Sequence, residues 1–145
     1  MRFLKMSGAK AGVAAALVSG AVLLAAERAG LTGKAAPRKI GERLLDRLHL
    51  RHSNAADKVS GVVAHFSYSS ACGKFYERAV RGRVLPRHRT LEGMLFGAAV
   101  WTSSYFGWVP ALGLMQDPTR DRPDRTLVTF GANVLYGAVL STLTA

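Results

Sequence analysis

Apolar residues gather in four stretches of this 145-residue chain, and none of the four contains a Lys, Arg, Asp or Glu. The stretches cover 11–26, 59–73, 93–116 and 126–145 and are 16, 15, 24 and 20 residues long. A helix needs about 20 residues to cross the hydrocarbon layer of a membrane, so the third and fourth suffice by themselves. A water-soluble bundle would instead carry charges along one face of each helix. The pattern therefore predicts an all-α, integral membrane four-helix bundle.

The two shorter stretches extend into their flanks. Lys10, Lys58 and Lys74 stand at their margins. A lysine there can lay its methylene stem along apolar surface and keep its ammonium among the lipid headgroups. We therefore predict one domain, 1–145, with transmembrane helices at 7–29, 54–78, 91–116 and 123–145.

Local chemistry marks the ends of these helices. Asn54 is a good N-cap with Asp57 in the turn that follows, and Pro123 suits the first turn of the fourth helix. Pro110 lies inside the third stretch, where its missing N–H leaves the Phe106 carbonyl without its helical partner. We therefore expect a kink in the third helix between residues 101 and 110.

Small residues recur at every fourth position of the first helix, at Gly8, Gly12, Ala16 and Gly20. This spacing places them in one stripe, which lets a neighbouring helix approach closely. An alternative interpretation is a cleaved secretory signal peptide, because basic residues precede an apolar stretch that ends in small residues. The stripe favours a packing helix, since a leader peptide does not need small residues on one face.

The two halves of the chain resemble each other. Residues 64–70 read AHFSYSS and residues 132–138 read ANVLYGA. The third helix opens on Gly-x-x-x-Gly at Gly93 and Gly97, as the first helix opens on its own pair of glycines. These matches predict two tandem two-helix hairpins of parallel topology, related by an axis along the membrane normal.

Each half also carries a polar pair, His65 with Tyr68 in the second helix and Asn133 with Tyr136 in the fourth. Three-residue spacing places each pair on one face, at a depth near the middle of the membrane. One interpretation is a polar centre that binds a small solute or passes a proton, with His65 changing charge near neutral pH. The other is hydrogen bonding between helices, at about 0.6 to 2 kcal/mol per bond. The lack of an intramembrane carboxylate favours the second interpretation.

The connectors hold all the charge and account for a net charge of +11. Residues 37–49 alternate apolar and charged positions at helical spacing, which predicts an amphipathic helix on the membrane or on the end of the bundle. Anionic lipid headgroups are the expected partners of the basic connectors. Nucleic acid is not expected, because the cations are dispersed rather than gathered on one reading helix. The density of basic residues favours both termini in the cytoplasm.

Recognisable site chemistry is sparse. Asp46, His49 and His52 recur at a spacing that wraps away from a single helical face and lacks a fourth ligand. Cys72 is the only cysteine, and a small buried apolar role is expected for it. We predict no catalytic residues, no metal site and no cofactor.

Several short motifs are spread over most of the chain: ERAGL at 27–31, GWVPALG at 107–113 and TRDRP at 119–123. The last two are the most specific for a protein family. With the AHxxY segment they resemble a family of small bacterial inner-membrane proteins that is known only as a domain of unknown function and is distantly similar to the YagU type. The resemblance implies a bacterial inner-membrane location. It implies no catalytic residues.

The favoured function is a non-enzymatic, multi-pass membrane protein that acts through lipid or protein partners in the cell envelope, with homo-oligomers among the expected assemblies. The alternative is a minimal oligomeric transporter or channel with a polar site around His65 and Asn133. A lipid-modifying enzyme is disfavoured, because no nucleophile or paired acid and base stands out.

Overall fold

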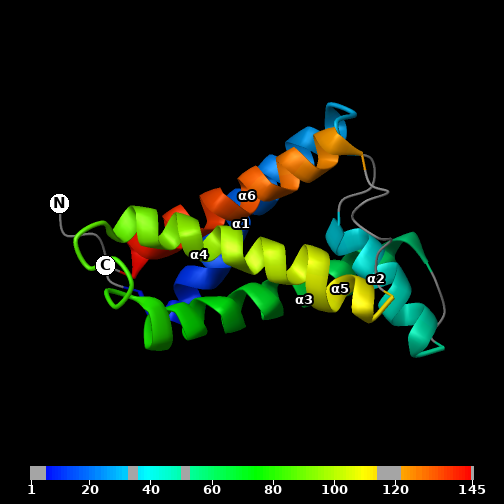
Figure 1. The fold of residues 1–145 in the computed structure, drawn as a ribbon. Helices are drawn as coiled ribbons and strands as arrows, with labels where there is room; N and C mark the ends of the chain where they lie inside the picture. The colour runs from blue at the N-terminus through cyan, green and yellow to red at the C-terminus, as the bar shows by residue number, and fades with distance from the viewer. Residues whose placement is uncertain (1–5, 33–35, 50–52, 114–121, 145) are drawn as a thin grey trace.

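The computed structural model describes residues 6–32, 36–49, 53–113 and 122–144, and this part of the chain is helical without a strand, as predicted. Four long helices dominate Figure 1. They are α1 (Gly8–Arg28), α3 (Asn54–Phe75), α4 (Arg89–Ser103) and α6 (Pro123–Leu143).

Shorter elements complete the chain. The amphipathic segment forms α2 (Ala36–Arg47) and packs against α3. A π-helical segment, η1 (Tyr76–Val80), prolongs α3. A second π-helical segment, η2 (Ser104–Trp108), and a single turn, α5 (Val109–Ala111), prolong α4.

The N-cap of α3 differs from the residue that the sequence predicted. Ser53, not Asn54, is the N-cap of α3, and its hydroxyl accepts a hydrogen bond from the Ala56 N–H at 3.0 Å. Serine and asparagine cap almost equally well, so their order along the chain alone does not decide between them. Pro123 is the first residue of α6, as predicted.

The third of the four predicted helices is interrupted within the range expected from Pro110. Gly107 leaves the helical conformation, with φ −105° and ψ −108°, inside η2. The proline ring conflicts with the carbonyl four residues earlier, and the widened π-helical turn with its glycine accommodates that conflict. Gly113 follows α5 with φ +66°, a conformation that glycine adopts without steric cost. The predicted end of this helix at 116 lies outside the described residues.

Neighbouring long helices run antiparallel. Helix α1 packs against α3 and α6, and α4 packs against α6. The N–H of Met6 donates to the Leu143 carbonyl at 2.9 Å, which joins the start of α1 to the end of α6. We call this the terminal end of the molecule, where η1 also lies. From there α1 and α6 diverge from α3 and α4 towards the α2 end (Figure 1).

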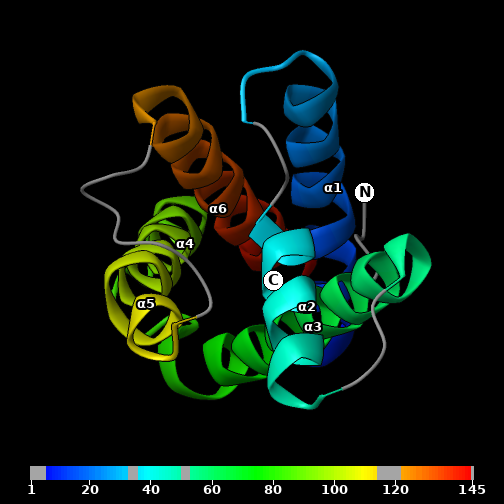
Figure 2. The same ribbon diagram turned by 90° about the vertical axis from the view of Figure 1, so that its right-hand side faces the viewer.

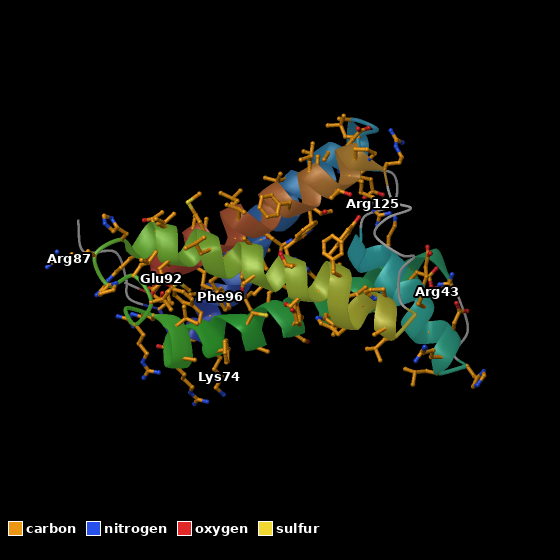
Figure 3. The ribbon with its side chains drawn as sticks, viewed as in Figure 1. Arg43, Lys74, Arg87, Glu92, Phe96 and Arg125 are labelled. Atoms are coloured by element: carbon orange, nitrogen blue, oxygen red, sulfur yellow. The ribbon has the colours of Figure 1, made fainter. Side chains whose placement is uncertain are left out.

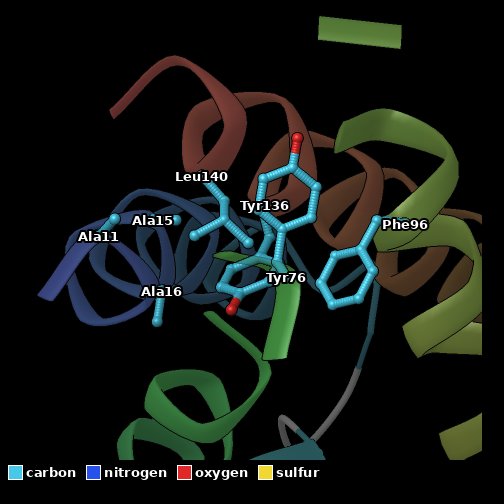
Figure 4. Close-up of a cluster of buried hydrophobic side chains, with 7 residues drawn as sticks. All are labelled: Ala11, Ala15, Ala16, Tyr76, Phe96, Tyr136 and Leu140. Atoms are coloured by element: carbon cyan, nitrogen blue, oxygen red, sulfur yellow. The ribbon is translucent and has the colours of Figure 1, made fainter. Parts of the chain in front are cut away.

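The closest packing lies near the terminal end. Figure 4 shows three alanines of α1 facing two tyrosines, a phenylalanine and a leucine from the other helices. The alanines keep α1 close to its neighbours, and the larger side chains fill the space that remains. The members of this cluster are Ala11, Ala15, Ala16, Tyr76, Phe96, Tyr136 and Leu140.

Two helices, α1 and α6, are long and apolar enough to cross a membrane, with 21 residues each. Helix α3 is 22 residues long but less apolar, because His65 and several serines lie within it and charged residues lie near its ends. Helix α4 ends after 15 residues at the π-helical interruption. A membrane-spanning bundle of four helices therefore remains a prediction.

Candidate functional site

A cavity of about 150 Å³ lies between the diverging helices and is bordered by α1, α3, α6 and the chain from α4 to α5. Figure 2 looks along the molecule from the α2 end and shows these four walls in the order α1, α6, α4 and α3 around the view. The cavity follows from this divergence, because the closest contacts between the four long helices lie near the terminal end.

All four members of the predicted polar cluster line this cavity. His65 and Tyr68 come from α3, and Asn133 and Tyr136 come from α6. The three-residue spacing within each pair places both its side chains on the inner face of the helix. The structure thus brings together residues that are 68 positions apart in the sequence.

Hydrogen bonds already occupy the polar groups of three of these residues. The hydroxyls of Tyr68 and Ser104 lie 2.8 Å apart, and the Tyr136 hydroxyl donates to the Ser69 carbonyl at 2.7 Å. The Asn133 side-chain amide donates to the Thr129 carbonyl at 2.9 Å, within its own helix. Only the two tyrosine bonds therefore join different helices.

His65 is the exception in this cluster. Its imidazole has a backbone hydrogen bond with Ala16 of α1. Its Nε2 atom is buried and has no hydrogen-bond partner among the described residues. A buried polar atom without a partner is costly, and a neutral imidazole limits that cost compared with a charged one.

Aromatic side chains that the sequence analysis did not assign to the site form the wall opposite α3. The Trp101 and Tyr105 rings stack at 4.7 Å, and the Tyr68 ring lies 5.2 Å from that of Trp108. The indole N–H of Trp101 donates to the Thr129 hydroxyl at 3.2 Å. The spacing 101, 105, 108 is the helical signal that predicts a shared face for these rings.

The predicted packing glycines occupy two equivalent helix crossings. A Cβ atom added to Gly8 would clash with the Gly73 carbonyl on α3, and one added to Gly12 would clash with the Ser69 carbonyl. Gly93 and Gly97 of α4 approach α6 in the same way, against the carbonyls of Gly137 and Asn133. Ala16 is fully buried, whereas Gly20 has open space around it.

These crossings correct the register of the internal repeat. The sequence match pairs His65 with Asn133, but the glycine contacts pair Gly73 with Gly137 and Ser69 with Asn133. The true correspondence is shifted by four residues, one helical turn. His65 therefore corresponds to Thr129 in the second half, and the two polar pairs do not occupy equivalent positions.

The terminal end is organised by Glu92, which is 1% exposed. Its carboxylate accepts backbone hydrogen bonds from Gly82, Val84 and Leu85 at 2.8 to 3.1 Å. It also accepts a bond from the Tyr76 hydroxyl at 3.3 Å. Figure 3 shows Glu92 beside Phe96 within the basic end of the molecule.

Opposing effects set the ionisation of this pair. Burial by itself would raise the pKa of Glu92, but the four hydrogen bonds together favour the carboxylate and lower that pKa below its ordinary value. Burial and the neighbouring Glu92 carboxylate raise the pKa of Tyr76 to about 12. The ionised Glu92 side chain therefore holds the turn between η1 and α4 in place through its hydrogen bonds, a role that we call the brace.

The described residues do not form a cluster of possible metal ligands. Among the described residues no three His, Cys, Asp or Glu side chains gather closely enough to hold a metal ion. Asp46 lies near the end of α2 and His49 in the turn that follows, but His52 lies outside the described residues. Cys72 is a half-buried thiol on the cavity wall.

Searches of protein families, curated proteins and solved structures found no significant match to the chain. The resemblance to small bacterial inner-membrane proteins therefore stays a prediction.

Proposed function

We propose that the chain is a non-enzymatic, multi-pass protein of the bacterial inner membrane that acts through lipid partners. The distribution of apolar side chains carries this proposal. Leu17 of α1, Val63 of α3, Leu95 of α4 and Leu127 of α6 are each at least half exposed, with Leu127 at 70%. Large apolar residues thus face outward on all four long helices.

The interior has the opposite character. Fully or nearly buried positions on the long helices include Ser19, Ser69, Thr129 and Ser141. Small hydroxyl residues between helices are typical of membrane proteins, where close backbone approach and hydrogen bonds hold helices together. Water would penalise the exposed apolar surface, whereas hydrocarbon would not.

The terminal end supports lipid headgroups as partners. The connector from 74 to 92 has six basic and two acidic residues. Within the described part of the chain both acids accept hydrogen bonds from backbone N–H groups rather than pairing with cations, Glu92 from Gly82 and Glu77 from Gly8, each at 2.8 Å. The exposed cations that include Lys74 and Arg87 (Figure 3) are thus available to anionic phospholipids.

Membrane extraction tests this proposal directly. The untagged protein expressed in bacteria should sediment with membranes, resist alkaline carbonate and need detergent for release. A folded monomer that stays in the supernatant after high-speed centrifugation without detergent would contradict the proposal.

One observation favours the alternative of a minimal oligomeric transporter, because His65, Tyr68, Asn133 and Tyr136 share one cavity. Replacing His65 with Ala separates the two functions. A transporter should lose proton or solute flux in vesicles, or change the pH dependence of that flux. A packing role predicts a lower unfolding temperature in detergent only, with His88→Ala as the exposed control.

A further inference from the structure

We propose that the central cavity binds one acyl chain of a membrane phospholipid, inserted from the side where α1 and α6 diverge from α3 and α4. The proposal rests on the membrane location proposed above and adds a binding site within the bundle. The cavity has walls from all four long helices and a volume of about 150 Å³.

The chemistry of the wall selects hydrocarbon over a polar solute. None of the described residues that line the cavity is an Asp, Glu, Lys or Arg, so an ion or a charged headgroup would meet no opposite charge there. The hydroxyls of Tyr68 and Tyr136 and the NH₂ group of Asn133 are already bonded within the protein. The Nε2 atom of His65 is covered by protein and is not offered to an occupant.

Most of the remaining surface is apolar or aromatic. Trp101, Tyr105 and Trp108 supply one wall, with Leu23, Ala64 and Val100 among the aliphatic contributions. An apolar cavity of about 150 Å³ stays dry and accepts a molecule the size of benzene. This volume fits a segment of an acyl chain, so the headgroup of the same lipid would stay outside the bundle.

The source of the chain is the surrounding bilayer. The helices that border the cavity present exposed apolar side chains outward, including Val22 on α1, Val62 on α3 and Phe106 on η2. A phospholipid beside these faces can move a chain inward without leaving hydrocarbon. Filling the cavity in this way also supplies the contacts that an empty space between helices would lack.

Tryptophan fluorescence gives a direct test, because the chain has two tryptophans and both line the cavity. The protein is reconstituted in vesicles of phosphatidylglycerol and phosphatidylethanolamine, with or without bromine atoms on the acyl chains, which quench tryptophan on contact. Ala64→Phe fills the cavity from α3 and should lower the quenching, with a part remaining because Trp108 is 36% exposed and also meets lipid outside the bundle. Ala71→Phe, at an exposed position of the same helix, should quench like the unchanged protein.

A folded, membrane-inserted Ala64→Phe protein that keeps the quenching of the unchanged chain overturns the cavity proposal and leaves the membrane proposal intact. Failure to insert at all would instead overturn both. Should Ala64→Phe not fold, Ser19→Leu fills the same cavity from α1. Mass spectrometry of the unchanged, detergent-purified protein provides a readout without substitution. Retained phospholipid supports the site, and retention of no lipid, or of free fatty acid alone, overturns it.

Discussion

Glu92 is the most buried carboxylate among the described residues, and each of its oxygens accepts two hydrogen bonds. Glu92→Gln would turn an NH₂ group towards two existing donors, whichever way the amide is oriented. We expect a loss of about 2 to 4 kcal/mol in the free energy of unfolding, because buried N–H groups would lose a charged acceptor. Denaturation in detergent, followed by circular dichroism, measures this loss.

Asp124→Asn is the matched control for that substitution. Asp124 forms a surface ion pair with Arg122 at 3.0 Å, and both side chains are more than half exposed. Exposed pairs contribute at most about 1 kcal/mol, so this variant should unfold close to the unchanged protein. Equal losses in the two variants would contradict the brace assigned to Glu92.

The lowered pKa of Glu92 also predicts an acid dependence of stability. The contribution of the carboxylate is complete above the unfolded pKa of about 4.3 and is lost as the pH falls through the lower folded pKa. Thermal unfolding of the unchanged protein should therefore move to lower temperature over this acidic range. Glu92→Gln should show a smaller shift, and an identical pH profile would contradict the assignment.

The spacing of residues along the sequence predicts which side chains share a face of one helix. The spacing of His65 with Tyr68, and of Asn133 with Tyr136, predicted shared faces, and these residues do line one cavity. The role of Glu92 could not be predicted, because its partners Gly82, Val84 and Leu85 bind through backbone groups. From sequence alone, a glutamate in a basic connector is expected to be an exposed surface charge, because the turn that buries it is not visible there.

Helix crossings are set by the smallest residues, and α1 contains both a test position and its control. An alanine Cβ at Gly12 would clash with the α3 backbone, whereas one at Gly20 would meet open space. Gly12→Ala should destabilise the protein by about 1 to 3 kcal/mol, because α1 and α3 must move apart. Gly20→Ala should be neutral or stabilising by up to about 1 kcal/mol, because alanine favours a helix. Chemical denaturation of both variants in the same detergent measures the difference.

Equal effects at the two glycines would contradict the crossing assigned to Gly12. The predicted stripe of small residues included both positions, because periodicity identifies a face of the helix but not the length of the contact.

The register of the internal repeat was missed for a related reason. The sequence match aligned Tyr68 with Tyr136. The equivalent close contacts are instead made by Gly73, where α3 meets α1, and by Gly137, where α6 meets α4.

The all-α class followed from apolar periodicity and from the separation of charge into connectors. The divergence of α1 and α6 from α3 and α4 (Figure 1) could not be predicted, because it depends on where distant helices touch. Small residues bring the helices together near the terminal end, and the large rings of Trp101 and Trp108 lie farther along, where the cavity opens. Local pattern identifies such residues, but only the assembled helices show the space between them.

The antiparallel order of the four long helices predicts a membrane topology. The described chain begins at Met6 and ends at Thr144, both at the terminal end with the turn between η1 and α4 that contains Arg83, and α2 lies at the other end (Figure 1). The basic residues of that turn favour the cytoplasm for the terminal end. In a Cys72→Ala background, a cysteine replacing Arg83 should react with a membrane-impermeant maleimide only in inverted vesicles. A cysteine replacing Arg47 at the end of α2 should react in intact spheroplasts. Labelling of both positions from one side would contradict the four crossings, whereas opposite sides in the reversed sense would keep the bundle and invert its orientation.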